Sequence, residues 1–192
     1  MEKRFTNKIV VVTGATQGIG LACAERLHEE GATVCAIQRG QSKLFDSFKF
    51  DLSKEQDCSK SIDVIVKKYG RIDVLVNNAG IMKESSLMDT SLEDWNQTIS
   101  VNLTAPFLLS KFAMPFLIES EGCIVNIGSI EGIGANPNHA AYCSSKAGLH
   151  GLTRSIAVDH GKDGVRCNAV APGWIDTKLN EDFINSMPAS EH

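Results

Sequence analysis

The feature that most constrains the fold is the regular alternation of short apolar runs with longer segments that suit helices. Short runs rich in Val and Ile predict strands that are buried on both faces of a parallel sheet. The segments between them predict the crossover helices that join parallel strands. The sequence predicts strands at 9–12, 33–37, 48–52, 72–76, 123–127 and 165–170.

Helices are predicted at 18–30, 53–69, 92–118 and 138–161. Gly31 is a natural C-terminal stop for the first of them. Ser53 and Gln56 have the spacing of a capping box, and Pro115 predicts a kink or an end in the third helix. The link 39–49 is too short and polar for a helix, so one crossover is expected to lack one. The whole chain, 1–192, is expected to form one α/β domain.

Charge and composition exclude several classes of function. Apolar residues make up 43% of the 192 residues and charged residues 22%, as in ordinary globular proteins. The net charge of −4 leaves no basic face, so we expect no nucleic-acid partner. We find no signal peptide and no apolar stretch near the ~20 residues of a membrane helix, so we expect a cytoplasmic protein. The six cysteines form no metal-ligand spacing and are interpreted as reduced and structural; no metal is expected.

A glycine-rich turn, Thr13 to Gly20, joins the first strand to the first helix. Glycines allow a tight turn and let a pyrophosphate approach the helix N-terminus, where free N–H groups favour an anion. The context of strand, turn and helix is the one that a dinucleotide site requires. The spacing is G-x-x-x-G-x-G, and by itself it would also fit a tight turn without a ligand.

Further motifs follow in order along the chain: Asn77-Asn78-Ala79-Gly80, Asn102, Ser129, Tyr142-x-x-x-Lys146 and Pro172-Gly173-Trp174-Ile175-Asp176-Thr177. Together with the glycine turn, they resemble the short-chain dehydrogenase/reductase family from about Lys8 to Thr177. The resemblance implies a doubly wound Rossmann sheet with strand order 3-2-1-4-5-6. It also implies an NAD(P)(H)-dependent oxidoreductase that interconverts a carbonyl and a secondary alcohol.

The resemblance assigns catalysis to Asn102, Ser129, Tyr142 and Lys146. Tyr142 and Lys146 are four residues apart and therefore share one helix face. A nearby ammonium is expected to lower the pKa of the Tyr142 phenol, so that it can serve as general acid or base. Ser129 would hold the substrate oxygen, Lys146 would also bind the nicotinamide ribose, and Asn102 would support a water path to the lysine.

Cofactor contacts are implied for a larger set: Gly14, Thr16, Gln17, Gly18, Ile19, Gly20, Arg39, Asp51, Leu52, Asn78, Ala79, Gly80, Tyr142, Lys146, Pro172, Gly173, Ile175 and Thr177.

Two positions in the sequence bear on which cofactor is used. The usual ribose-binding acid is replaced by the neutral Gln38, and Arg39 can grip a 2′-phosphate. We therefore predict a preference for NADP(H), with NAD(H) as the alternative and a solvated Arg39 as the simpler explanation. Asp51 and Leu52 would lie near the adenine ring, although Asp51 could equally do no more than precede a helix.

The substrate is not specified by the sequence. Pocket candidates are Ile81, Met82, Ile130, Glu131, His139 and Trp174, a mixed set that fits a small ketone, a polyol or a sugar-like alcohol. His139 is interpreted as a surface or rim residue. The helices 92–118 and 138–161 resemble the family's dimer faces, so we expect a homo-dimer or homo-tetramer if the fold permits.

The C-terminus departs from the family pattern. Residues 178–192 are expected to begin a substrate lid or to form a disordered tail, and the family's last helix and strand are missing. We therefore expect the strand 165–170 to be an exposed sheet edge. This departure leaves a second hypothesis open, namely a non-catalytic nucleotide-binding or interaction subunit of the same fold.

Overall fold

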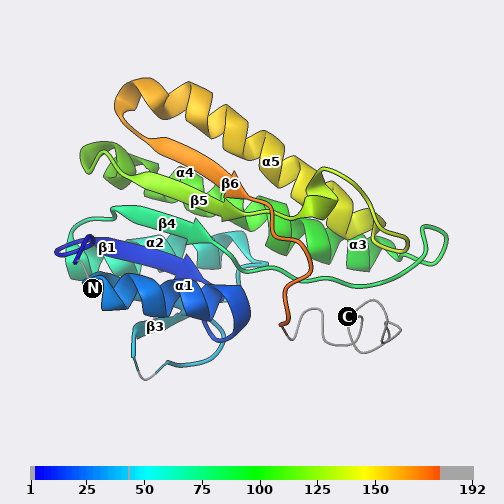
Figure 1. Cartoon of the computed structure of the whole chain (residues 1–192), viewed down its shortest axis with the longest axis horizontal. Helices are drawn as coiled ribbons and strands as arrows, with labels where there is room; N and C mark the ends of the chain where they lie inside the picture. Colours follow the sequence, from blue (N-terminus) through cyan, green and yellow to red (C-terminus); the bar gives the residue numbers. More distant parts are fainter. Residues whose placement is uncertain (1–2, 43, 178–192) are drawn as a thin grey trace.

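The computed structural model of the chain describes residues 3–42 and 44–177. Its centre is one parallel sheet of six strands in the order β3-β2-β1-β4-β5-β6, as predicted (Figure 1). The strands are β1 (Ile9–Thr13), β2 (Thr33–Gln38), β3 (Asp46–Lys49), β4 (Val74–Asn77), β5 (Cys123–Ile127) and β6 (Arg166–Val170). The order reverses between β1 and β4, and in sheets of this kind ligands bind outside the carboxyl ends of the strands at that point.

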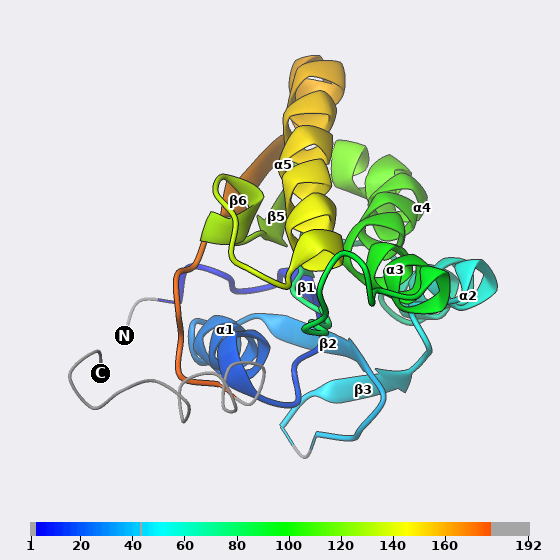
Figure 2. The same cartoon turned by 90° about the vertical axis from the view of Figure 1, so that its right-hand side faces the viewer.

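Helices cover the two faces of the sheet unequally (Figure 2). They are α1 (Gly18–Glu29), α2 (Glu55–Tyr69), α3 (Leu92–Ile99), α4 (Ala105–Glu119) and α5 (Ala140–His160), with the short turns η1 (Ser100–Thr104), η2 (Ile130–Gly132) and η3 (Gly161–Asp163). Because successive strand side chains point to opposite faces, Val11 packs in the core with α2, α4 and α5, whereas Val10 and Val12 pack in the core with α1.

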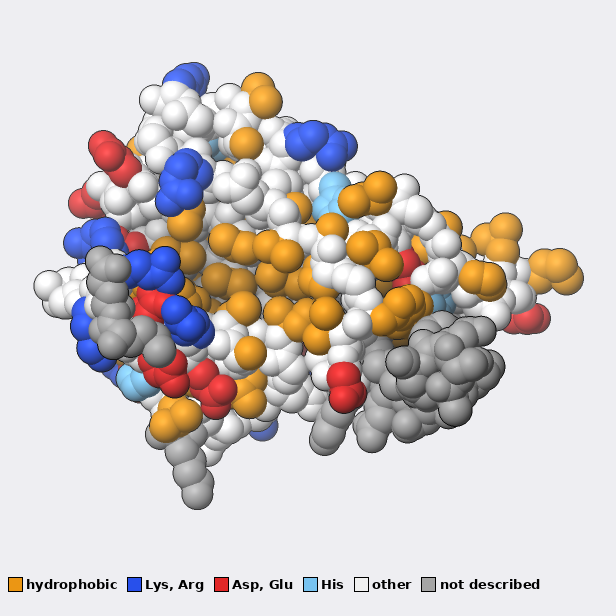
Figure 3. Space-filling view, viewed as in Figure 1, with side chains coloured by type: hydrophobic (Ala, Val, Ile, Leu, Met, Phe, Trp, Pro, Cys, Tyr) orange, Lys and Arg blue, Asp and Glu red, His pale blue; other side chains and the backbone are white. Residues whose placement is uncertain are grey.

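The α1 side of the sheet is open over its second half. In the part of the chain that the structure describes, no helix lies over β4, β5 and β6 on this face, and Figure 3 shows apolar side chains gathered there. Cys123 and Val125 are only partly buried, and Val170 is half exposed. β6 is the last strand of the described sheet, so the expected exposed edge is confirmed.

The helix predicted at 92–118 is divided by the turn η1, which has π-helical geometry. Pro115 lies inside α4 and does not end it, because Ala113 and Leu117 on either side are fully buried in the core. The prediction that no apolar stretch comes near the length of a membrane helix was wrong. The helical segment Leu92–Glu119 is long and apolar enough to cross a membrane, by length and composition alone. Half of its most apolar window is buried, and it is the core helix of this fold.

The prediction was also inaccurate around β3. This strand ends at Lys49, where its partner β2 ends, and so it begins and ends earlier than predicted. The capping box is absent because α2 starts after Lys54 and the Ser53 hydroxyl donates to Asp51 Oδ1 instead, at 2.7 Å. The remaining predictions, for residues 178–192, lie outside the described residues.

Candidate active site

A cavity of about 620 Å³ runs along the carboxyl edge of the sheet. It is bounded by the glycine turn, the end of β2 and the segments that follow β3, β4, β5 and β6. Nearly every predicted site residue lines it: Gly14, Thr16, Gln17, Gly18, Ile19, Gly20, Arg39, Asp51, Leu52, Asn78, Ala79, Gly80, Ser129, Tyr142, Lys146, Pro172, Gly173, Ile175 and Thr177. Motifs far apart in the sequence therefore meet at one site.

The glycine turn is shaped for a close backbone approach. Gly14 and Gly18 have φ values of +67° and +55°, which only glycine adopts readily. A side-chain carbon at Gly20 would overlap the carbonyl oxygen of Gly14 and the amide of Asn78. The Asn78 amide donates to the carbonyl oxygens of Thr13 and Gly14, at 3.0 and 3.1 Å, and so fixes the turn.

The turn leads into the N-terminus of α1. Gln17 is the N-cap residue of this helix, and its side chain makes no capping bond to the described part of the chain. The N–H groups of the first helical turn are therefore available to an anion, and the helix dipole favours one there. Both features fit the pyrophosphate of a dinucleotide.

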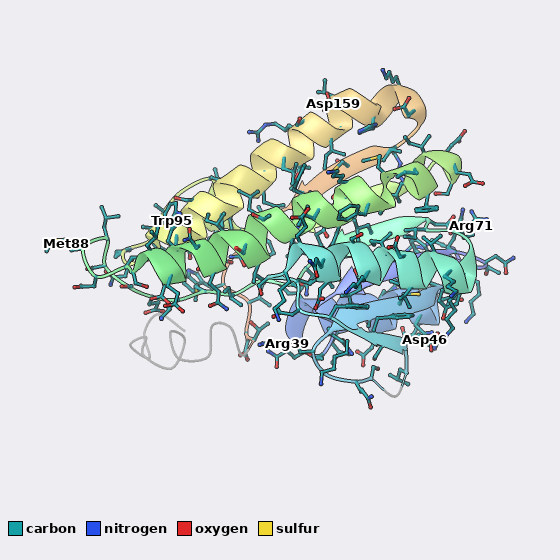
Figure 4. The ribbon with its side chains drawn as sticks, turned by 180° about the vertical axis from the view of Figure 1, so that it is seen from behind. Arg39, Asp46, Arg71, Met88, Trp95 and Asp159 are labelled. Atoms are coloured by element: carbon teal, nitrogen blue, oxygen red, sulfur yellow. The ribbon has the colours of Figure 1, made fainter. Side chains whose placement is uncertain are left out.

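Two side chains at the end of β2 fit a ribose. Gln38 is buried; its Nε2 donates to Ser47 Oγ at 3.0 Å, and its Oε1 has no hydrogen-bond partner within residues 3–42 and 44–177. Such a buried acceptor is costly unless a ligand donates to it. Arg39 is exposed beside it and lines the cavity (Figure 4).

Asp51 lines the cavity beyond β3. Its Oδ1 accepts hydrogen bonds from the hydroxyl and the backbone N–H of Ser53, and these bonds hold the pKa of the Asp51 carboxyl below its usual value. Ser53 thus fixes the carboxylate of Asp51 in place at the cavity. Asp51 also precedes α2, as the simpler explanation of this residue requires.

Ser129, Tyr142 and Lys146 meet at the other end of the cavity. Ser129 follows β5, and its Oγ accepts from the Glu131 N–H at 3.1 Å. Tyr142 and Lys146 lie on the first two turns of α5, with Lys146 Nζ 5.6 Å from the centre of the Tyr142 ring. Lys146 Nζ also donates to the carbonyl oxygen of Ile127 at 2.8 Å.

The pKa values of this group differ from the expectation. Burial raises the pKa of Tyr142, the hydrogen bond with Ser129 opposes that rise, and the charge of Glu131 adds to it. Burial lowers the pKa of Lys146 to about 8. The prediction that Lys146 lowers the pKa of Tyr142 is therefore wrong for the protein alone, because burial is the largest influence on both groups and the charge of Glu131 adds to the rise at Tyr142.

Asn102 stands behind the cavity wall, in the wide turn η1. Its side chain accepts from the N–H of Ile81 and donates to the carbonyl of Ile81, both at 2.9 Å, and donates to Ser145 Oγ at 3.1 Å. A side-chain carbon at Gly80 would lie 3.5 Å from Asn102 Oδ1 and 3.6 Å from Lys146 Nζ. The missing side chain of Gly80 therefore leaves room between these two polar atoms.

At the substrate end of the cavity, one predicted pocket residue lies elsewhere. Ile81, Met82, Ile130, Glu131 and Trp174 line it as predicted, but His139 does not. His139 is 2% exposed and lies behind Glu131, with its Nδ1 2.8 Å from Glu131 Oε2. The interpretation of His139 as a surface or rim residue was wrong, because its side chain is buried. The sequence did not reveal its contact with Glu131, since the two residues lie on different elements and no periodicity relates them.

Comparison with known proteins agrees with this geometry. The family model described as short chain dehydrogenase matches residues 8–187. The chain belongs to the short-chain dehydrogenase family. Its relatives in this family are named as dehydrogenases and reductases. The chain is therefore an oxidoreductase that acts on CH–OH groups.

Relatives of this short-chain dehydrogenase are longer than it is. Meso-2,3-butanediol dehydrogenase of Serratia marcescens is 38% identical over 94% of this chain and 76% of its own length. A 3-oxoacyl-[acyl-carrier-protein] reductase of Thermotoga maritima is 36% identical over 93% and 78%.

Solved structures confirm the fold. Ligand-free aldohexose dehydrogenase of Thermoplasma acidophilum has a TM-score of 0.90 and 40% identity, over 98% of this chain and 76% of that one. A Beutenbergia cavernae protein described as an NAD(P)-dependent gluconate 5-dehydrogenase, with NADP bound at low occupancy, has a TM-score of 0.91 and 30% identity, over 97% and 80%.

Proposed function

We propose that this chain is an NADP(H)-preferring dehydrogenase/reductase that interconverts a small carbonyl compound and its secondary alcohol. The observation that carries the proposal is the continuity of the cavity from the glycine turn to Tyr142. The N-terminus of α1 would hold the pyrophosphate of a dinucleotide bound along it, and Ser129 and Tyr142 would lie beside its nicotinamide. The cofactor supplies the hydride, and the chain supplies binding, orientation and the proton.

The proton steps fall to Tyr142. In reduction its phenol donates a proton to the carbonyl oxygen and becomes phenolate, and in oxidation the phenolate accepts the proton of the alcohol. Ser129 orients the same oxygen beside the phenol, which lowers the barrier by positioning. Lys146 would bind the ribose hydroxyls while keeping its hydrogen bond to the Ile127 carbonyl, because an ammonium has three N–H donors. A water for proton exchange would enter beside Gly80, where the missing side chain leaves room between Lys146 and Asn102.

The preference for NADP(H) is supported by charge. Arg39 is an exposed guanidinium at the ribose end of the cavity, and the neighbouring Gln38 carries no negative charge to repel a 2′-phosphate. The NADP bound to the Beutenbergia cavernae protein is consistent with this proposal.

We further propose a cytoplasmic location and a homo-oligomeric state. The oligomeric state is proposed because α4 and α5 carry exposed apolar residues such as Phe107 and Val158.

The proposal is tested by titrating the full chain with NADPH and NADH in a calorimeter and then measuring NADPH oxidation with a panel of small ketones. We expect tighter binding of NADPH and turnover of at least one ketone. Binding without any turnover, in either direction, would instead support the non-catalytic subunit. No binding of either cofactor would contradict both functions.

A further inference from the structure

The substrate end of the cavity contains a carboxylate that catalysis does not use. Glu131 lies two residues after Ser129, lines the cavity and is 5% exposed. Its Oε1 accepts from Asn136 Nδ2 at 2.9 Å, and its Oε2 lies 2.8 Å from His139 Nδ1 and accepts from Cys143 Sγ at 3.4 Å. Burying a carboxylate is costly, so a carboxylate held by three partners beside the reacting group calls for a role.

The charge of this cluster is negative whatever the state of its histidine. His139 lies between two carboxylates, with Nδ1 on Glu131 and Nε2 3.7 Å from Glu84 Oε1. With a neutral imidazole the three groups sum to −2, and with a protonated one they sum to −1. Within the described residues, no Lys or Arg forms an ion pair with Glu131 or Glu84. Two cations line the same cavity: Arg39 lies at the end of β2, and Lys146 binds the Ile127 carbonyl beside Tyr142.

The wall that carries Glu131 is fixed to a second wall of the cavity mouth. The Ser85 N–H donates to the Asn138 carbonyl at 2.8 Å, and Ser85 forms an isolated parallel bridge with His139. The segment after β4 is therefore joined to the segment that enters α5. Glu131 cannot turn away from an incoming substrate without breaking its contacts with Asn136, His139 and Cys143, and the bridge to Ser85 holds that segment in place.

The negative charge also reaches the reacting oxygen. His139 and Tyr142 are in edge contact, with ring centres 6.3 Å apart. Glu131 is one of the groups that raise the pKa of Tyr142. A second negative charge brought next to the phenol by a substrate would meet the same field.

We propose that Glu131, held by His139, is the specificity-determining residue of the substrate pocket. It rejects carbonyl compounds that carry a carboxylate or phosphate next to the reacting carbon, and it leaves the pocket to uncharged ones. The inference rests on the proposed function, because it presumes a carbonyl substrate beside Tyr142. At an effective dielectric constant near 20, repulsion between two unit charges about 6 Å apart weakens binding by roughly 100-fold. Partial screening by solvent lowers this effect to about tenfold or more.

The test compares pyruvate with methyl pyruvate, which share the reacting ketone and differ in charge. Replacing Glu131→Gln keeps the size and one of the two accepting oxygens but removes the charge. We expect the ratio of kcat/KM for pyruvate to that for methyl pyruvate to rise about tenfold or more. Glu93→Gln is the matched control, since Glu93 is an exposed carboxylate in the first turn of α3. An unchanged ratio in a folded Glu131→Gln variant that binds NADPH would overturn the proposal.

A second measurement needs no variant. Isobutyramide and isobutyrate have the same shape and differ by one charge, and each is titrated against the unsubstituted chain with NADPH bound. We expect the amide to bind about tenfold more tightly or better; equal affinity would refute the role of Glu131. If the chain binds NADPH but reduces neither ketone, the proposed function fails, while this pair still tests the charge of the pocket.

Discussion

The ammonium of Lys146 passes beside the ring of Tyr142 and donates to the carbonyl oxygen of Ile127, at the end of β5. The lysine is 4% exposed, and this one backbone bond does not offset the loss of its hydration, so its pKa falls to about 8. In the protein without cofactor, the buried charge of Lys146 is therefore unfavourable, and it should lower the free energy of unfolding.

The first prediction concerns the pH dependence of unfolding. The pKa of Lys146 is about 8 in the folded chain and near 10.4 when unfolded, so the unfolded state binds more protons between these values. The free energy of unfolding of the unsubstituted chain should thus rise relative to that of Lys146→Met as pH increases from about 8 to 10, by up to about 3 kcal/mol over the full window.

The comparison with Lys146→Met is needed because other groups titrate in the same range. Burial raises the pKa of Cys35 and Cys167 to about 12, which lowers stability at high pH equally in both proteins. Urea unfolding at several pH values without cofactor gives the difference. Parallel stability curves for the two proteins would contradict a depressed pKa.

The second prediction concerns the phenol. Replacing Tyr142→Phe removes the proton donor and leaves the ring that packs against Lys146. We expect NADPH affinity to stay within about twofold, and turnover to fall by the ~10²–10⁴ typical of a general acid. Calorimetry and steady-state kinetics separate the two effects. A Phe variant that turns over at the original rate would exclude the proposed mechanism.

The third prediction concerns the choice of cofactor. Arg39→Asp replaces a guanidinium that can bind a phosphate with a carboxylate that repels it. Hydrogen bonds to charged groups contribute about 1.5–3 kcal/mol, so the ratio of NADPH to NADH affinity should fall by about 10- to 100-fold. Arg154→Asp makes the same charge change on the exposed side of α5 and should leave the ratio unaltered. A ratio that moves equally in both variants would mean that Arg39 acts only through net charge.

The fourth prediction compares two glycines in or next to helices. Gly20→Ala places a carbon against the Gly14 carbonyl and the Asn78 amide, so the turn must shift. We expect a loss of about 1–3 kcal/mol in the free energy of unfolding and weaker NADPH binding.

Gly161→Ala serves as the control, because nothing lies within 4 Å of its added carbon and its backbone is helical. There we expect no change or a gain of up to about 1 kcal/mol, since alanine is the better helix former. Chemical denaturation and a cofactor titration of both variants check the pair. Equal effects would show that the space around Gly20 is not decisive.

Apolar runs and the segments between them predicted the parallel sheet, because those are local patterns. The family resemblance carried by the glycine turn and the later motifs implied the strand order and most of the cavity lining. It did not find the contact between His139 and Glu131, which depends on how the segment after β5 folds back against α5. It also assigned the wrong direction to the pKa of Tyr142, because the spacing of Tyr142 and Lys146 gives their proximity but not their burial. Tertiary packing, and not local pattern, decided each of these points.

The wide turn η1 has a consequence for how this protein tolerates insertions and deletions. A π-helical turn closes its hydrogen bond over one residue more than an α-helical turn, so removing one residue from Ser100–Thr104 would convert this wide turn into an ordinary one. The apolar side of α4 would keep facing the sheet, but Asn102 would lose its hydrogen bonds with Ile81. A loss of one codon here would therefore spare the packing of the core and damage the site behind Gly80.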